Sequence, residues 1–385
     1  MVFNQKLTNI FNLIVNLSSN NGSELIMRTM YNHPFFRCIG LLILFLMCSC
    51  SSTSQKNQIV FLDNKTDSLQ LGTPDLVLPL DGSVESLGDR ALLSLKERNG
   101  MFYLLDGQSK KLYSINAGGN TEYVIDRVGR GPGEYLNILD FDVSKDGSVY
   151  LLTGEGDEVM LFSEGRFINK FQIGFRASSM AFMYDNDIAF FKQRYEDDHL
   201  GKNVIVITDS QFKVKNAFLE EPSTILTGSG EHLVSGTCNS ILCYQQYDNN
   251  LYWFDRDGIL SRQTIDFGEK VFPESFLAVE DFGEMFPLLS EMSAYYINSC
   301  FENKHYILLN ITLCDHMNEN DRFICLYNKN NQKTVVKRVK RDSDEYEIKG
   351  LPIHLTQDNK MVFLFDGDKT SLNESKYSLV FFKLK

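Results

Sequence analysis

The stretch "GSVYLLTGEGDEVMLFSEGRFINKFQIG", residues Gly147–Gly174, contains three runs of strand-forming residues separated by a polar loop and a tight turn. Val, Tyr, Leu, Phe and Ile dominate the runs, whereas the breaks hold Gly, Asp, Glu and Ser. A fourth run, "ILDFDVS" (Ile138–Ser144), comes directly before this stretch. Together the four runs predict a small antiparallel sheet joined by hairpins.

The same order of runs and breaks recurs along the chain, in stretches that begin at Gly100, Asn186, Asn239, Lys304 and Asn359. Four-stranded units repeated at this length are typical of a β-propeller. The last copy reaches Lys385 without an outer strand, which a spare strand near the N-terminus, Asp75–Asp81 or Gln58–Asp63, can supply. The sequence therefore predicts an all-β fold, a six-bladed β-propeller over residues 58–385.

A partly helical insertion is predicted between blades four and five, within Lys270–Ala294. Its apolar residues follow a helical spacing: Phe276, Leu277, Val279, Phe282, Met285, Phe286, Leu288 and Leu289. A helix broken near Pro287 either caps the central channel or packs over the edges of the blades.

The connections between strands divide between the two faces of such a ring. Turns between strands one and two, and three and four, share one face and are short, as at Ser144–Ser148 and Asp255–Gly258. We call the opposite face the loop-rich face, because it receives the long connections: Arg127–Asn137, Tyr195–Asn203, Glu220–Glu231, Lys270–Ala294, Cys314–Arg322 and Asp342–Pro352. Long loops in compact domains usually carry function, so we expect the binding surface there.

The crossing loop "RVGRGPGEYLN" (Arg127–Asn137) leads from the outer strand of blade one to the inner strand of blade two. Its glycines permit positive φ angles and close backbone approach, and its proline stiffens the crossing. Arg130 and Glu134 either bind an anionic or hydroxylated ligand or form an ion pair that locks the two blades. A strand and not a helix follows the loop, which argues against a phosphate site. The candidate ligand or blade-junction residues are Arg130, Gly131, Gly133, Glu134 and Tyr135.

The N-terminal region has the pattern of an export signal. From Met27 a short basic segment leads into the apolar run Cys38–Cys48, which is too short to span a membrane. Ser49 and Cys50 follow, and a small residue before a cysteine resembles the lipobox of bacterial lipoproteins, with Cys50 as the lipidated residue. We therefore expect residues 1–26 to be a non-native extension, 27–49 a signal peptide and 50–57 a polar tether.

The motif "GRGPGEY" (Gly129–Tyr135), followed by "LNILDFDV" and preceded by a lipoprotein-like signal, resembles the bacterial six-bladed β-propeller lipoproteins with a G-x-G-P-G-E-Y/F loop, relatives of the NHL-repeat propellers. The resemblance implies a location in the bacterial cell envelope, anchored by lipid and most often at the outer membrane. It implies no common reaction and no catalytic residues.

Composition excludes several classes of function. The formal net charge is −12, and the one short basic run, Val335–Arg341, fits the solvated edge of a strand, so we expect no nucleic-acid partner. The clusters Tyr195–Gly201 and Cys314–Asp321 match no zinc or calcium spacing, and we expect no metal and no cofactor. Five cysteines follow Cys50; burial in the reduced state is the simplest interpretation, while an exported protein permits a Cys314–Cys325 disulfide.

These patterns leave two functions open. The first is a binding or interaction module whose loop-rich face takes a glycan, a peptide or a protein. The alternative is a propeller enzyme, a hydrolase or lyase acting on a carbohydrate or peptide-derived substrate, although the chain contains no catalytic motif. The sequence does not specify the oligomeric state.

We predict that Cys50 carries the lipid anchor. Mass spectrometry of the protein extracted from membranes should find an acylated N-terminal peptide that begins at Cys50. A mature protein that starts elsewhere without acylation would refute this assignment.

Overall fold

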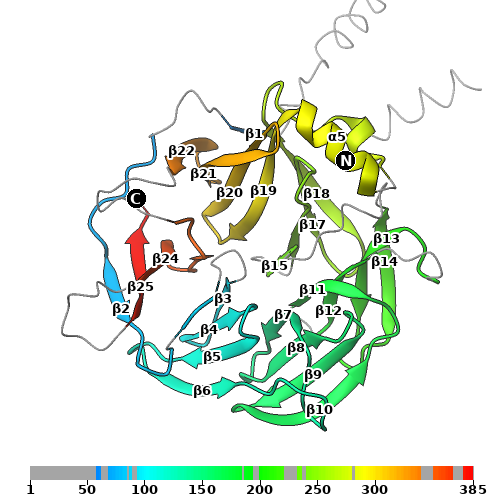
Figure 1. Cartoon of the computed structure of the whole chain (residues 1–385), viewed down its shortest axis with the longest axis vertical. Helices are drawn as coiled ribbons and strands as arrows, with labels where there is room; N and C mark the ends of the chain where they lie inside the picture. Colours follow the sequence, from blue (N-terminus) through cyan, green and yellow to red (C-terminus); the bar gives the residue numbers. More distant parts are fainter. Residues whose placement is uncertain are drawn as a thin grey trace, which may run out of the picture. The chain divides into compact units, whose positions relative to one another are not determined.

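The computed structural model describes residues 58–61, 68–84, 86–88, 93–183, 186–193, 199–220, 232–235, 240–279, 282–339, 350–366 and 376–384. These residues form a ring of six sheets around a common axis (Figure 1), which confirms the predicted six-bladed β-propeller. No helix among them is long and apolar enough to cross a membrane.

In blades one to five the chain enters at the inner strand and leaves at the outer side after an antiparallel meander, whereas the outer strand of blade six comes from the N-terminal part of the chain. Blade one consists of β3 (Leu93–Arg98), β4 (Met101–Asp106), β5 (Lys111–Ile115) and β6 (Thr121–Ile125). Blade two consists of β7 (Ile138–Val143), β8 (Val149–Thr153), β9 (Glu158–Ser163) and β10 (Arg166–Gln172). Blade three consists of β11 (Ala177–Phe182), β12 (Ile188–Lys192), β13 (Asn203–Thr208) and β14 (Val214–Glu220).

The later blades repeat this order. Blade four consists of β15 (Leu233–Ser235), β16 (Ile241–Tyr244), β17 (Asn250–Phe254) and β18 (Ile259–Asp266). Blade five consists of β19 (Ser293–Glu302), β20 (Tyr306–Asp315), β21 (Asn318–Asn328) and β22 (Lys333–Val339). Blade six consists of β23 (His354–Leu355), β24 (Lys360–Asp366), β25 (Tyr377–Lys383) and the N-terminal strand β2 (Leu76–Pro79).

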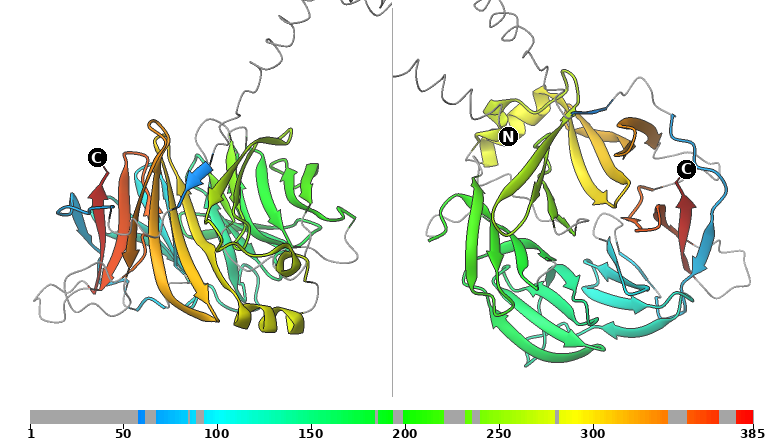
Figure 2. Two further views of the ribbon diagram at one scale, coloured as in Figure 1. Left: turned by 90° about the horizontal axis from the view of Figure 1, so that it is seen from above. Right: turned by 180° about the vertical axis from the view of Figure 1, so that it is seen from behind.

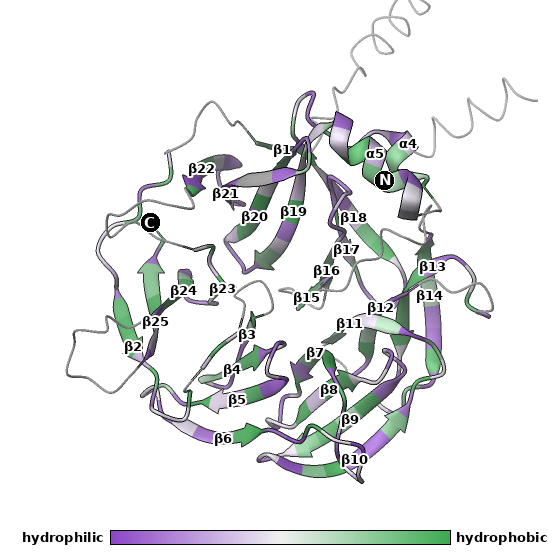
Figure 3. Cartoon of the chain, viewed as in Figure 1, coloured by the Kyte–Doolittle hydropathy of each residue, from purple (hydrophilic) through white to green (hydrophobic). Residues whose placement is uncertain are grey.

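The hydrophobic core is divided among the blade interfaces, and each pair of neighbouring blades encloses its own cluster. Between blades two and three, for example, Val159, Met180 and Phe190 are fully buried. Because both faces of the middle strands pack against neighbours, these strands read as continuous apolar runs, as in β12, where every residue is buried. Figure 3 shows this contrast: apolar colour follows the middle strands, while outer strands such as β10 and β22 include hydrophilic stretches.

The N-terminal segment closes the ring and also lines its outer edge. β2 pairs antiparallel with β25, so that Leu78 lies opposite Leu379, which confirms the first of the two predicted closing strands. The second candidate has a different partner: β1 (Gln58–Val60) pairs in parallel with β18 and adds a fifth strand to blade four. Between them, Leu69 donates its N–H to the carbonyl of Val336 in blade five. The chain therefore passes the outer strands of blades four, five and six before it enters blade one (Figure 1).

The insertion between blades four and five forms two helices, α4 (Glu274–Leu277) and α5 (Phe282–Glu291). α5 continues through Pro287, so the predicted break at that proline is wrong. Both helices lie over blades four and five at the rim of the ring, away from the central channel (Figure 1), where Phe276 and Met285 pack against Tyr296 and Cys314. Of the two expectations, packing over blade edges is the one realised.

The turns confirm most of the assignment of connections to faces. Viewed from the side (Figure 2), the strands run between two faces, and α5 lies on one of them. One expected long loop is instead a hairpin: β20 and β21 continue to a two-residue turn at His316 and Met317, whose φ angles are 50° and 64°.

The proposed Cys314–Cys325 disulfide is absent. In the register of blade five, Cys314 lies opposite Ala294 and Cys325 lies opposite Leu309, so the two thiols do not face each other. Both are buried, and no disulfide forms among the cysteines in the described residues. Cys238 lies outside the described residues.

Closure of the ring by β2 predicts that substitutions at two neighbouring residues, Leu78 and Val77, change the free energy of unfolding by different amounts. Leu78 is 5% exposed in the core between blades six and one, whereas Val77 is 51% exposed. Replacing Leu78 with alanine should lower the free energy of unfolding by about 2–5 kcal/mol, and Val77→Ala should change it by less than about 0.5 kcal/mol. Urea unfolding followed by tryptophan fluorescence measures both. Equal effects would show that β2 does not close the ring.

Candidate functional site

The crossing loop between β6 and β7 is built around the carboxylate of Glu134. The Gly131 N–H donates to Glu134 Oε2 at 2.7 Å, and a Cβ on Gly129 would lie 2.0 Å from the same oxygen. The backbone from Gly129 to Gly131 therefore wraps the carboxylate, and a side chain at position 129 would require the Glu134 carboxylate to move.

Gly133 completes the turn of the loop over blade two. Its φ angle is +75°, and a Cβ there would lie 2.8 Å from the ring of Phe167 on β10. The Glu134 N–H donates to the carbonyl of Gly131 at 3.1 Å, which closes the turn. A positive φ angle is present at Gly133 and not at Gly131, so the two predicted glycines serve different purposes.

Tyr135 anchors the loop to blade one. Its side chain is 3% exposed, and its hydroxyl donates toward the carbonyls of Lys110 (2.9 Å) and Ile125 (3.1 Å) while it accepts the Arg127 N–H at 3.3 Å. Burial raises the pKa of Tyr135 to about 12, so the phenol stays protonated and remains a donor. Tyr135 therefore joins the end of blade one to the start of blade two.

Arg130 takes no part in this network. The predicted ion pair between Arg130 and Glu134 is absent from the described part of the chain, because the Glu134 carboxylate is held by backbone. Arg130 itself is exposed on the loop-rich face. The predicted site residues are thus brought together as a structural unit in which Gly133 and Tyr135 are buried, while Arg130, Gly131 and Glu134 are exposed.

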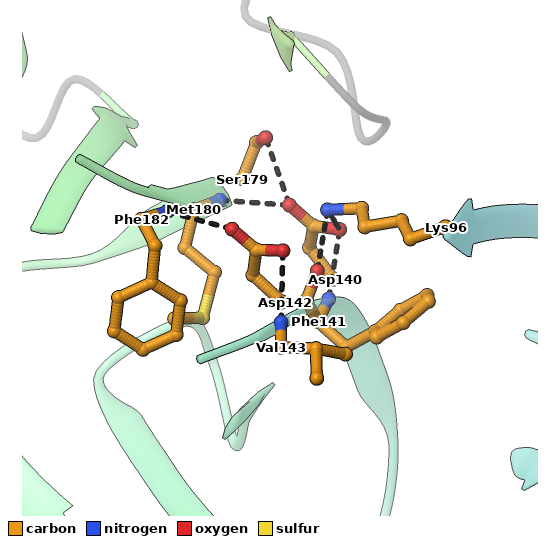
Figure 4. Close-up of polar contacts among 8 residues, drawn as sticks. All are labelled: Lys96, Asp140, Phe141, Asp142, Val143, Ser179, Met180 and Phe182. Carbon is orange, nitrogen blue, oxygen red and sulfur yellow. Dashed lines mark hydrogen bonds and ion pairs between the residues drawn. The ribbon is translucent and has the colours of Figure 1, made fainter. Parts of the chain in front are cut away.

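The inner strands carry a set of polar contacts that join blades one, two and three (Figure 4). Asp140 on β7 is 2% exposed, and its Oδ1 accepts the Phe141 N–H at 2.7 Å and Lys96 Nζ of blade one at 3.3 Å. Its Oδ2 accepts the Ser179 hydroxyl at 2.9 Å and the Met180 N–H at 2.7 Å, both in blade three. Each oxygen of this carboxylate therefore has two donors.

Asp142 and Arg98 also make hydrogen bonds between neighbouring blades. Asp142 accepts the Val143 N–H at 2.8 Å and, across the interface, the Phe182 N–H of blade three at 2.6 Å. Arg98 Nε of blade one donates to the carbonyl of Val143 at 3.1 Å. Because the hydrogen-bonding capacity of Asp140 is already used, these carboxylates hold blades together and have little left for a ligand.

These carboxylates are not among the site residues predicted from the sequence, although a signal is present there. Asp140 and Asp142 alternate with apolar residues in "ILDFDV", a run assigned to an inner strand. Two acidic residues on one face of a buried strand need donors from a neighbouring blade, because an unpaired buried charge is costly. The pattern predicts that these carboxylates accept hydrogen bonds from a neighbouring blade, but the identity of the donors depends on how the blades pack.

Glu97 and His354, on the inner strands β3 and β23, form a pair in which one carboxylate oxygen has no hydrogen-bond partner among the described residues. Glu97 Oε2 on β3 is buried with no hydrogen-bond partner in the described residues, and it lies 3.9 Å from His354 Nε2 on β23. Burial, helped by the nearby Asp358, raises the pKa of Glu97 against the opposing effect of Lys360. Burial and the Lys96 ammonium lower the pKa of His354 to about 4, so the imidazole is neutral at pH 7.

No group of His, Cys, Asp and Glu side chains in the described residues is arranged to hold a metal ion. Residues 195–198 of the acidic run Tyr195–Gly201 lie outside the described residues.

Two substitutions in the crossing loop should change the free energy of unfolding by different amounts. Tyr135→Phe removes a buried hydroxyl and should lower the free energy of unfolding by about 1–2 kcal/mol. Arg130→Ala, at an exposed position of the same loop, should change it by less than about 0.5 kcal/mol. Denaturant unfolding of both variants measures the difference, and a large loss for Arg130→Ala would mean that this arginine is part of the blade junction.

The neutral imidazole of His354 predicts a pH dependence of stability. The folded protein binds the His354 proton only near pH 4, whereas the unfolded chain binds it near pH 6.5. The unfolded state therefore takes up more protons in this window, and stability should fall by about 2–3 kcal/mol as pH drops from 6.5 to 4. His354→Asn should remove that part of the loss, while the surface control His199→Asn should not. Thermal melting across this pH range tests the difference, and parallel curves for wild type and His354→Asn would contradict it.

Comparison with known proteins places this geometry among bacterial propellers. The structure is similar to that of a candidate exported protein from Bacteroides fragilis NCTC 9343, with a TM-score of 0.68 and 19% identity over 85% of this chain and 99% of that one. It is also similar to a member of the DUF4221 family from Bacteroides vulgatus, with a TM-score of 0.51 and 12% identity over 82% of this chain and 98% of that one. No curated protein matches the sequence. The sequence model of DUF4934, a domain of unknown function, matches residues 91–378, and the chain therefore belongs to the DUF4934 family.

Proposed function

We propose that this protein is an exported, lipid-anchored binding module that recognises its ligand through the loop-rich face. The observation that carries the proposal is the distribution of exposed apolar side chains. Five large ones lie in connections of the loop-rich face: Val128, Leu136, Val271, Phe286 and Met317. The others lie on outer strands, and none lies in a described tight turn of the opposite face. Exposed apolar side chains gathered on one face mark an interaction surface.

Two further observations support this proposal. The polar residues of the inner strands are mostly engaged between blades, as Asp140 shows, so the long connections supply most of the groups that a ligand can reach. The signal-like sequence supports export and lipid anchoring at Cys50, and export agrees with the name of the similar Bacteroides fragilis protein. An anchored propeller would hold its ligand at the cell envelope.

A thermal-shift screen of the detergent-solubilised full chain against glycans, peptides and divalent ions tests the proposal, because a ligand of the native state raises the melting temperature. Replacing Arg127, Arg130 and Leu136 together with serine should abolish the shift caused by a ligand that binds beside the crossing loop. The matched control replaces Lys145, Asp146 and Asp257, in tight turns of the opposite face, with serine. This control variant should keep the thermal shift. The reverse outcome would assign binding to the tight-turn face and overturn the proposal.

One observation favours the alternative, a hydrolase or lyase. The unpartnered Glu97 Oε2 beside the neutral His354 is an arrangement that could move a proton in the channel. Any turnover detected with a screened carbohydrate or peptide should then be lost in Glu97→Gln while binding persists. Turnover that survives this substitution would place the chemistry elsewhere.

A further inference from the structure

The C-terminal part of α5 and the tip of the β20–β21 hairpin form one continuous surface on the rim of the loop-rich face. The His316 N–H donates to the carbonyl of Met292, and His316 Nδ1 donates to the carbonyl of Ser290, both at 2.9 Å. These bonds hold the hairpin tip against the end of the helix. We call Phe286, Ser290, His316 and Met317 the rim surface.

The two large apolar side chains of the rim surface are exposed to solvent. Phe286 is 46% exposed and Met317 is 51% exposed. Beneath them, Phe276 and Met285 are buried against blade five, so the helix has a separate, inward-facing apolar side. Phe286 and Met317 are not members of this buried cluster.

The charges around this surface are almost all negative. Exposed carboxylates in the described residues of the insertion and the hairpin tip are Glu269, Glu274, Glu284, Glu291 and Asp315. The one lysine of the same segments is Lys270, whose ammonium lies 5.3 Å above the ring of Tyr295 in blade five. Three of these carboxylates, on Glu284, Glu291 and Asp315, lie within two residues of a member of the rim surface along the chain.

We propose that the rim surface binds a basic segment of a partner protein, one that combines Lys or Arg with apolar side chains. The apolar residues of such a segment would cover Phe286 and Met317, and its cations would pair with the surrounding carboxylates. This inference rests on the proposed binding function and names the partner chemistry for one part of the loop-rich face.

The same charges argue against two other occupants. A second copy of this chain would bring an identical ring of carboxylates against the first, which like-charge repulsion opposes. An anionic membrane surface is repelled for the same reason. A basic, partly apolar peptide is the occupant whose chemistry complements both parts of the surface.

The test uses a fluorescent helical peptide with lysines on one face and leucines on the other, titrated into the detergent-solubilised full chain and followed by anisotropy. Phe286→Ser combined with Met317→Ser should weaken binding about tenfold or more, as should Glu284→Lys combined with Glu291→Lys. The matched controls, Ile259→Ser with Leu260→Ser on the outer edge of β18 and Asp257→Lys in a tight turn, should bind as the wild type does. Melting curves confirm that every variant is folded.

Several results would overturn the inference. Equal binding of a peptide with glutamate in place of lysine, or unchanged binding by both rim variants, would exclude recognition of a basic segment at this surface. A dimer in sedimentation that Phe286→Ser dissociates would assign the surface to a second copy, and loss of vesicle binding in the same variant would assign it to a membrane. If a screened ligand depends on Arg130 and Leu136 and not on Phe286, the proposed function stands and this inference fails.

Discussion

Closure of the ring is the constraint on which the rest of the structure depends. Blade six combines β23, β24 and β25 from the end of the chain with β2 from its beginning, and Leu78 enters the core between blades six and one through this pairing. Because each core cluster lies between two blades, an open ring would leave the clusters at its two ends without a partner. The N-terminal segment that precedes β2 follows the edges of three blades and therefore stabilises the side on which the ring closes.

Polar contacts near the axis complement these apolar interfaces. The carboxylate of Asp140 takes donors from blades one and three, so a single side chain in blade two relates three blades to one another. The crossing loop does the same at the loop-rich face, where Tyr135 ties the junction to blade one and Gly133 packs on Phe167 of blade two. These contacts use directional bonds, and they set the angle between blades where apolar packing alone tolerates small shifts.

Much of a loop that resembles a ligand site is therefore explained by the demands of the fold. In "GRGPGEY" the glycines at 129 and 131 lie against the Glu134 carboxylate and the tyrosine is buried, while the exposed Arg130 takes no part in these contacts. The exposed apolar residues of the long connections have no such structural role: Val128 and Leu136 lie in the crossing loop, and Val271 and Phe286 lie in the insertion over blades four and five. Function is therefore best sought among these connections.

The sequence by itself determined the number of blades, the order of their strands and the face that carries the long connections, and it narrowed the closing strand to two candidates, Asp75–Asp81 and Gln58–Asp63, between which the structure decided. These follow from local patterns, since alternating strand runs and tight turns report on residues that are close along the chain. The tertiary structure decided the rest: that Glu134 binds backbone and not Arg130, that Asp140 finds its donors in blades one and three, that Glu97 faces His354, and that α5 lies on the rim. Each of these depends on which blades are neighbours and on how their side chains meet, and residues far apart in sequence come together only when the ring closes.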